Sequence, residues 1–222
     1  MPKEPPIDLL NNSLKEIVFR RKNAKLFKKL AQITHFNLWE VEALALINRK
    51  ITQEMGPVTR TSFRDVVHSG FDYTENIRHL LVDKVFSIVD KKSTSVLSAD
   101  QWVEGLSIMI RGTLDERIDF AYKVYDFMKV NRLKKEQIFP MMRGCLIMPH
   151  REEDSDEMVK DLIELLLKKL DVDRNGKVSK KEYTYSVKEM NELVLECMGP
   201  VFPTREAIHA FLTTFTTKTH RF

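Results

Sequence analysis

A run of twelve residues, 171–182, carries the side chains of this sequence that are best suited to bind a metal ion. It reads Asp-Val-Asp-Arg-Asn-Gly-Lys-Val-Ser-Lys-Lys-Glu, with oxygen-bearing side chains at positions 1, 3, 5, 9 and 12. Hard divalent cations bind several oxygen ligands at about 2.3–2.6 Å, and carboxylates neutralise their charge. The run therefore predicts one site for Ca²⁺, for which Mg²⁺ would compete.

The spacing is that of an EF-hand calcium loop, in which each ligand position has its own task. The predicted ligands are the side chains of Asp171, Asp173 and Asn175, the carbonyl of Lys177, Ser179 through a water, and both carboxylate oxygens of Glu182. Gly176 permits the sharp turn between them. Apolar residues recur at helical spacing on both sides, which predicts a helix, a loop and a second helix that continues through 191–197. The alternative is a polar turn between two helices that binds no metal. Basic residues outnumber carboxylates in the loop, so we expect weak binding.

A second segment, 90–101, has the outline of the same unit without its ligands. Lys92 stands at position 3, where the metal needs an anion. Ser95 replaces the glycine, and neutral Gln101 replaces the bidentate glutamate. No calcium site is expected there.

Two more copies have also lost their ligands. The run 126–137 has apolar residues at positions 3 and 5 and Gln137 at position 12. The first copy, 37–70, passes through Gly56 and has no acidic residue between its two predicted helices. The chain is thus predicted to contain four hands, of which only the last binds calcium.

The predicted fold is all-α, with two lobes of paired EF-hands of the calmodulin and neuronal calcium sensor kind. One hand cannot cover its own apolar face, so hands pair. Apolar Leu97, Leu133 and Val178 at position 8 predict short strand pairs between loops. The expected domains are 1–24, an arm and the start of a basic helix; 25–112, the lobe of hands 1 and 2; 113–198, the lobe of hands 3 and 4; and 199–222, a C-terminal helix and tail.

Composition limits the possible functions of the chain. Of 222 residues, 43% are hydrophobic and 31% are charged, which allows a sizeable core but is too polar for a membrane span. The two ends suggest neither a secretory signal nor a lipid anchor. Cys145 and Cys197 lack metal spacing and are typical of buried thiols in a reducing compartment, an intermolecular disulfide being the alternative. No nucleophile with a base, phosphate loop or zinc spacing stands out, so an enzyme is not expected.

A basic helix is predicted over 14–33, opened by a capping box of Ser13 and Glu16. Its simplest interpretation is a solvated helix at a domain edge, although basic amphipathic helices also bind membranes, RNA or acidic proteins. The formal charge of +4 does not by itself indicate nucleic acid. The candidate partner-binding residues are Arg20, Arg21, Lys28 and Lys29. The predicted C-terminal helix after Pro203 has an apolar face that must dock in a groove of this chain or of a partner.

Three segments outside the loops resemble a known family. They are Trp-Val-Glu-Gly-Leu-Ser-Ile-Met-Ile-Arg-Gly at 102–112, Arg-Glu-Glu-Asp-Ser-Asp-Glu at 151–157 and Leu-Glu-Cys-Met-Gly-Pro at 195–200. With four hands and a basic N-terminal extension, they make the chain similar to the calaxins, EF-hand proteins related to neuronal calcium sensors. The resemblance runs from about residue 25 to 203. Calaxins bind calcium through their later hands, whereas this sequence keeps only the last site.

The resemblance implies a protein of the cytoplasm and cytoskeleton, in the axoneme of cilia and sperm flagella. It implies association with axonemal dynein, its docking complex or doublet microtubules, by contact with tubulin or coiled coils, without nucleic acid, membrane insertion or lipid anchor. We therefore expect a non-enzymatic calcium-binding adaptor. The alternative is a cytosolic regulator of an enzyme, channel or receptor, of the neuronal calcium sensor type.

Overall fold

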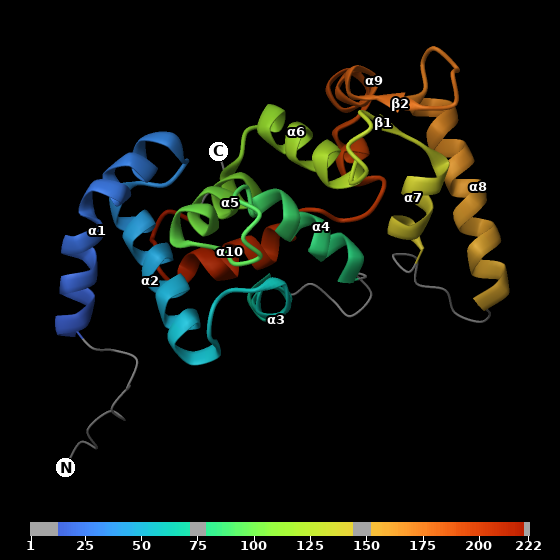
Figure 1. Ribbon diagram of the computed structural model, residues 1–222. Coiled ribbons are helices and arrows are strands. Elements are labelled where there is room, and N and C mark those ends of the chain that lie inside the picture. Colours follow the sequence, from blue (N-terminus) through green and yellow to red (C-terminus); the bar gives the residue numbers. More distant parts are fainter. Residues whose placement is uncertain (1–12, 72–78, 144–151, 220–222) are drawn as a thin grey trace.

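The described part of the protein is mainly helical (Figure 1). The computed structural model describes residues 13–71, 79–143 and 152–219, and the predictions for Cys145 and the side chain of Ser13 lie outside this part. The described elements are α1 (Ser13–Ile33), α2 (Leu38–Met55), α3 (Arg60–Phe71), α4 (His79–Val89), α5 (Ala99–Arg111), α6 (Leu114–Tyr125), β1 (Arg132–Leu133), α7 (Lys135–Met142), α8 (Glu152–Leu170), β2 (Val178–Ser179), α9 (Lys180–Tyr185), the π-helix η1 (Ser186–Met190), the 3₁₀-helix η2 (Glu192–Glu196) and α10 (Arg205–Thr213).

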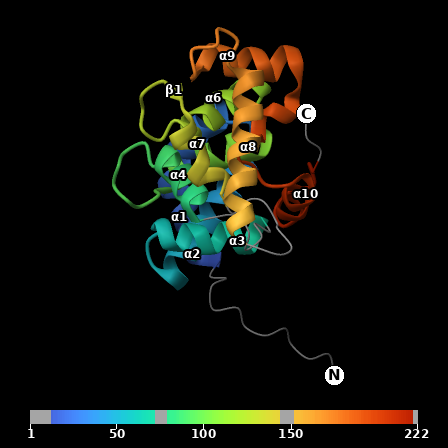
Figure 2. The ribbon, with the colours of Figure 1, turned by 90° about the vertical axis from the view of Figure 1, so that its right-hand side faces the viewer.

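Four helix pairs follow the predicted hands: α2 with α3, α4 with α5, α6 with α7, and α8 with α9. They enclose one continuous apolar core across the described chain. α1 lies at the left end of the molecule and α8 at the right end in Figure 1, and in Figure 2 α8 stands in front with α1 behind it. No helix within the described ranges has the length and apolarity that crossing a bilayer requires. The predicted all-α fold is confirmed.

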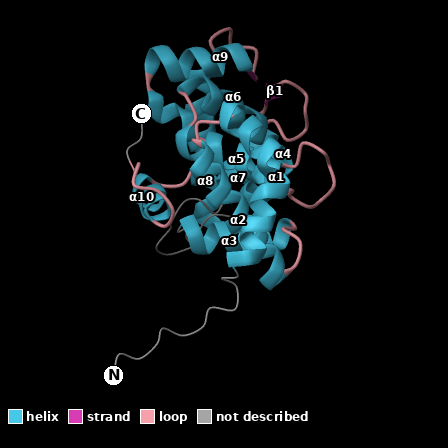
Figure 3. Ribbon diagram, turned by 90° about the vertical axis from the view of Figure 1, so that its left-hand side faces the viewer, coloured by secondary structure: helices cyan, strands magenta, loops and turns pink. Residues whose placement is uncertain are grey.

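The third and fourth loops pair as predicted, through the short antiparallel strands β1 and β2. Leu133 lies opposite Val178, and both side chains are fully buried. These two-residue strands are the sheet of the described chain, which is otherwise helix and loop (Figure 3). The pairing holds the fourth loop against the third through the strand register and the buried Leu133–Val178 pair.

The first two loops make a weaker version of this pairing. The Leu97 amide donates a hydrogen bond to the Val58 carbonyl at 2.9 Å, and both side chains are buried. The short connection through Gly56, at φ 82°, leaves no room for a twelve-residue loop between α2 and α3. Beneath it, Phe63 meets Trp102 edge to face at 6.4 Å between ring centroids. The helices of hand 1 therefore still pack against hand 2, although the connection between them is too short to be a calcium loop.

The helix expected to continue from 191 to 197 is not formed as one piece. α9 ends after six residues, a π-helix follows, and Asn191 turns extended at φ −165° before the 3₁₀-helix η2. The Asn191 side chain accepts a hydrogen bond from the Leu193 amide and so caps a new helical start. Asparagine competes with helical hydrogen bonds in this way, which is why a periodic apolar pattern alone mispredicted the segment.

The C-terminal helix α10 begins where predicted, with Thr204 accepting a hydrogen bond from the Ala207 amide. It packs on α3, where Phe211 meets Phe71 at 4.7 Å between ring centroids. The groove that receives this helix belongs to the chain itself. Its apolar face is thereby covered without a partner.

The residues after α10 cover a buried ion pair between α2 and α5. Arg111 donates two hydrogen bonds of 2.9 Å to Glu40, and both side chains are almost inaccessible. Thr216 donates to the same carboxylate at 2.8 Å, and the Lys218 carbonyl accepts from Arg111 at 2.7 Å. Burial raises the pKa of Glu40, but hydrogen bonds from Arg111, the Asn37 amide and Thr216 outweigh it and hold that pKa below its usual value.

Candidate metal centre

The fourth loop gathers three carboxylates between α8 and α9. One oxygen each of Asp171, Asp173 and Glu182 lies within 4.8 Å of the others. Asp171 follows the last residue of α8, and Glu182 lies in the first turn of α9. The two helices therefore hold the ends of the loop, and a divalent cation fits the charge and the oxygen donors of this cluster.

Backbone amides orient the first carboxylate. Asp171 accepts from the Asn175 amide at 3.0 Å and from the Gly176 amide at 2.7 Å. Gly176 has φ 77° and open space where a Cβ would lie, so only its backbone conformation demands glycine. Asn175 also donates its side-chain amide to Asp173 at 2.6 Å. Four of the predicted ligands are thus in one place: Asp171, Asp173, Asn175 and Glu182.

Glu182 has two tasks in this structure. One oxygen accepts from the amide and hydroxyl of Ser179, at 2.8 and 2.7 Å, and so caps α9. The other accepts from the amides of Val172 and Asp173. Burial raises the pKa of Glu182, but these hydrogen bonds outweigh it and lower that pKa below its usual value. The carboxylate stays ionised, as a metal ligand must.

The remaining predicted ligands are placed by the strand. Ser179 lies in β2 beside Glu182, and Lys177 precedes β2 in the chain. Lys180, one of the basic residues expected to repel the metal, instead contacts Asp119 on α6. One unfavourable charge of the loop is therefore compensated from outside it.

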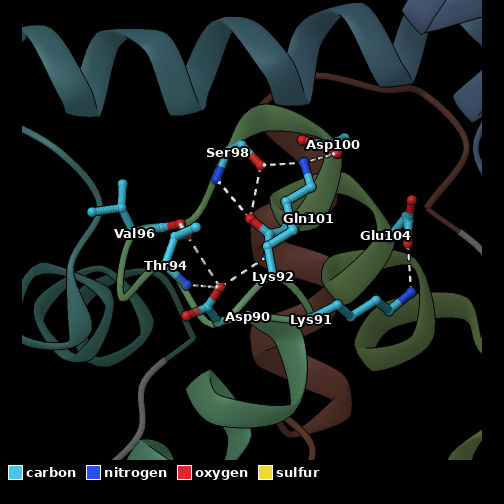
Figure 4. A network of polar contacts seen from close by, with 9 residues as sticks. All are labelled: Asp90, Lys91, Lys92, Thr94, Val96, Ser98, Asp100, Gln101 and Glu104. Atoms are coloured by element: carbon cyan, nitrogen blue, oxygen red, sulfur yellow. Dashed lines mark hydrogen bonds and ion pairs between the residues drawn. The ribbon is translucent and has the colours of Figure 1, made fainter.

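The second loop is closed without a metal (Figure 4). Gln101, at position 12, donates its side-chain amide to Asp90, at position 1, across 3.0 Å. Its oxygen accepts from the amide and hydroxyl of Ser98, as Glu182 does from Ser179. Asp90 and Gln101 are only 7% and 3% exposed. One N–H group therefore joins the two ends of the loop, where calcium would otherwise bridge two carboxylates.

Lys92 gives the same loop a cation of its own. Its ammonium nitrogen lies 2.6 Å from the Asp100 carboxylate and 3.3 Å from the Ser98 hydroxyl (Figure 4). The loop backbone keeps the calcium-loop turn, since Ser95 has φ 61° in the place of Gly176. Serine at such a φ is strained by about 1 kcal/mol, which the surrounding hydrogen bonds must offset. The loop thus keeps its shape although its chemistry has changed.

The third loop repeats this arrangement. Gln137 donates to Asp126 across 3.3 Å, and its oxygen accepts from the Lys134 amide at 3.0 Å. Asn131, at position 6, has φ 56°. We call the Asp90–Gln101 and Asp126–Gln137 contacts the loop-closing hydrogen bonds. Sequence reasoning missed them because glutamine at position 12 signalled only a lost ligand; the sequence signal was an aspartate retained at position 1 of both loops.

Comparison with known proteins places the chain. It matches no protein-family profile. It is 35% identical to calaxin of Danio rerio over 200 residues, which span 85% of this chain and 93% of that protein. It is 34% identical to calaxin of Homo sapiens over 191 residues, spanning 83% and 89%. The chain belongs to the calaxin family. A more distant match is a calcineurin subunit of Schizosaccharomyces pombe, 20% identical over 162 residues.

The predicted resemblance is confirmed, and as a member of the calaxin family the protein is an EF-hand calcium-binding protein. The loop-closing hydrogen bonds fall within the part shared with other calaxins. They show how two hands of a calaxin-type fold hold together without metal ligands.

The four basic residues singled out in the sequence do not form one group in this calaxin-type fold. Arg21, Lys28 and Lys29 are exposed on the outer face of α1. Arg20 faces α2, where it pairs with Glu42 at 3.5 Å and lies over the Trp39 ring at 5.4 Å. Trp39, near the start of α2, is 61% exposed.

Proposed function

We propose that this protein is a non-enzymatic calcium-binding adaptor of the axoneme in cilia and sperm flagella. There it associates with doublet microtubules or with the docking of outer dynein arms. Membership of the calaxin family supports the axonemal setting. The carboxylates of Asp171, Asp173 and Glu182, within 4.8 Å of one another, support one functional calcium site.

The observation that carries the proposal is the pair of loop-closing hydrogen bonds. A sensor hand opens when metal draws the carboxylate at position 12, and its helix, inward. In loops 90–101 and 126–137 an amide already joins position 12 to position 1. These two hands therefore have no position-12 carboxylate through which calcium could move a helix. The adaptor binds its partner mainly as a fixed structure. Calcium in loop 171–182 makes only a small adjustment to the surface that contacts the partner.

The energy required for a switch supports the same conclusion. Shifting a conformational equilibrium from 1:99 to 99:1 needs about 5.5 kcal/mol of differential binding. A single calcium site beside Lys177 and Lys181 is expected to bind too weakly to supply this energy. The β1–β2 pairing also joins it to loop 126–137, which has no calcium ligands at positions 3, 5 and 12.

A pull-down from ciliary or sperm extract tests the proposal. The tagged full chain and its Glu182→Gln variant are compared, each with calcium and with chelator. We expect the same axonemal partners in all four samples. Release of the partners by chelator, or their loss with Glu182→Gln, would identify a calcium switch and overturn the proposal.

The second candidate is a cytosolic regulator of an enzyme, channel or receptor. The match to a calcineurin subunit, a protein named as one part of a larger assembly, favours it. Imaging of the tagged chain in ciliated or sperm cells separates the two. Signal along the axoneme supports the adaptor, and signal confined to the cell body supports the regulator.

A further inference from the structure

The outer face of α1 carries a stripe of exposed cations. Within the described ranges, none of them forms an ion pair with an acidic side chain. The only acidic residue of α1, Glu16, pairs with Lys50 on α2 at 3.4 Å. We define the basic stripe as Arg21, Lys22, Lys25, Lys28 and Lys29.

These cations repel one another. The stripe spans 21–29, which is about 12 Å along a helix axis. Charges at this spacing lie within one or two Debye lengths, about 8 Å at physiological ionic strength, so screening removes only part of the repulsion. A ligand with matching negative charges would relieve it.

An apolar groove begins at the N-terminal end of the stripe. It has a volume of about 380 Å³, and Leu14, Val18, Phe19 and Arg49 help to line it. Leu14 and Val18 are 76% and 64% exposed, which is high for aliphatic side chains. Arg49 of α2 lies over the Phe19 ring at 4.7 Å and donates to the Lys15 carbonyl at 2.9 Å. The groove therefore has a fixed wall.

The groove and the stripe are in helical register. Leu14, Val18, Arg21, Lys25 and Lys28 follow one another at intervals of four, three, four and three residues, and all are exposed. This 3.5-residue period is the one along which a second helix packs in a coiled coil. The opposite face, with Phe27 and Leu30, is buried in the core. α1 thus packs one face against the rest of the protein and presents a second, exposed row of residues at coiled-coil spacing, which we call the outward seam.

We propose that this outward seam binds an acidic amphipathic helix of a partner protein. Its apolar side chains enter the groove beside Leu14 and Val18, and its carboxylates lie along the basic stripe. The inference rests on the proposed adaptor function, because it names the chemistry of the partner that the adaptor holds.

Other polyanions fit this face less well. An interfacial membrane helix needs a continuous apolar face, whereas the exposed apolar residues of α1 lie at its two ends, Leu14, Ile17 and Val18 at one and Ile33 at the other, with the basic stripe between them. A nucleic-acid backbone supplies phosphates but nothing apolar for the groove. Within the described chain the helix richest in carboxylates is α8, and Asp156 and Glu164 on it are already paired with Arg143 and Lys135, so a second copy offers the stripe fewer free carboxylates.

The test uses a designed peptide as probe. It has three heptads with Leu at positions a and d and Glu at e and g, which prevents the peptide from pairing with itself. A fluorescein label reports binding to the full chain by anisotropy, at two salt concentrations and with chelator. We expect salt-sensitive binding that does not need calcium. A peptide with Lys in place of Glu should not bind.

Charge reversal then locates the binding face. The variant Lys22→Glu, Lys25→Glu, Lys29→Glu should weaken binding about tenfold, on the order of what three exposed ion pairs contribute. The matched control, Lys160→Glu, Lys168→Glu, Lys169→Glu, changes the net charge equally on exposed positions of α8 and should leave binding within about twofold. The variant Leu14→Ser, Val18→Ser should also weaken binding, with unchanged salt dependence.

Equal weakening by the control variant would overturn the inference, because it would show a general charge effect. So would binding to phosphatidylserine vesicles or poly(U) RNA without binding to the peptide, or self-association of the chain that the α1 variant abolishes. Failure of the peptide while the axonemal pull-down succeeds refutes this inference alone. Peptide binding without axonemal partners refutes the proposed function alone.

Discussion

Replacing Gln101 with glutamate tests the loop-closing hydrogen bonds most directly. The change removes the donating amide and sets a second carboxylate at about the 3.0 Å that now separates Gln101 Nε2 from Asp90 Oδ1. Both side chains have little accessible surface, so little water can screen the two charges. Asp90 keeps its hydrogen bonds from the Ser95 and Thr94 amides and therefore stays in place.

The cost can be bounded in two ways. Two unit charges about 4 Å apart repel by about 4 kcal/mol at an effective dielectric constant of 20. Alternatively the new glutamate takes up a proton, which costs about 3.7 kcal/mol at pH 7 for a carboxyl of pKa about 4.3. We therefore expect the free energy of unfolding to fall by about 3–4 kcal/mol at pH 7. At pH 5 the proton costs only about 1 kcal/mol, and the protonated group can donate to Asp90 again.

Urea denaturation of the full chain in chelator measures this difference, with helical circular dichroism and the fluorescence of buried Trp102 as probes. The control Gln101→Met removes the hydrogen bond without adding a charge, so its deficit should be smaller and equal at both pH values. A Gln101→Glu deficit below about 0.5 kcal/mol at pH 7, or one that does not shrink at pH 5, would refute the role assigned to this contact.

Other expected outcomes concern calcium, acid and the buried ion pair. Calorimetry should find one calcium per chain, with Kd at or above about 10⁻⁷–10⁻⁵ M; two sites or nanomolar affinity would contradict the one-site prediction. Glu182→Gln should abolish this binding and keep the helical circular dichroism, because a glutamine at position 12 closes the two neighbouring loops. Hydrogen bonds lower the pKa of Asp90 and Glu40 despite burial, so their contribution to stability is complete above the unfolded values of 3.8 and 4.5 and is lost as pH falls through the lower folded values. Acid unfolding followed by circular dichroism should therefore begin only below about pH 4; onset near pH 6 would contradict this. Arg111→Met should lower the free energy of unfolding in urea by about 3–5 kcal/mol, and adding Glu40→Met should restore most of it; a double variant as unstable as the single one would argue against the pair.

Local patterns predicted most of the fold. The ligand spacing of 171–182 located the calcium loop, and apolar residues at position 8 predicted the β1–β2 pairing. Capping signals marked the starts of α1 and α10 within one or two residues. These features depend on neighbours in the chain, which a sequence displays directly. The proposed domain boundaries and partners stay predictions.

Features that depend on distant residues could not be predicted. The helical period of α1 shows apolar residues on more than one side but not which side meets α2, so the exposure of Leu14 and Val18 could not be predicted. For the same reason the sequence could not show that Trp39 is exposed. The role of Gln101 depends on an aspartate eleven residues away in a folded loop, and that of Arg111 on a tail 107 residues away.

That tail sets an order for the assembly of the protein as it is synthesised. Arg111 and Glu40 come from the first half of the chain, yet their hydrogen bonds to Thr216 and Lys218 span as many as 176 residues. At about 5–20 residues per second, the ribosome needs roughly 5–20 s after Arg111 to reach Lys218. For that time, a charged pair destined for the core lacks its last two partners, and the groove for α10 lies open. The part of the nascent chain that contains Glu40 and Arg111 therefore exposes apolar surface until translation is nearly complete. Chaperones that bind exposed apolar surface are expected to bind it during that time.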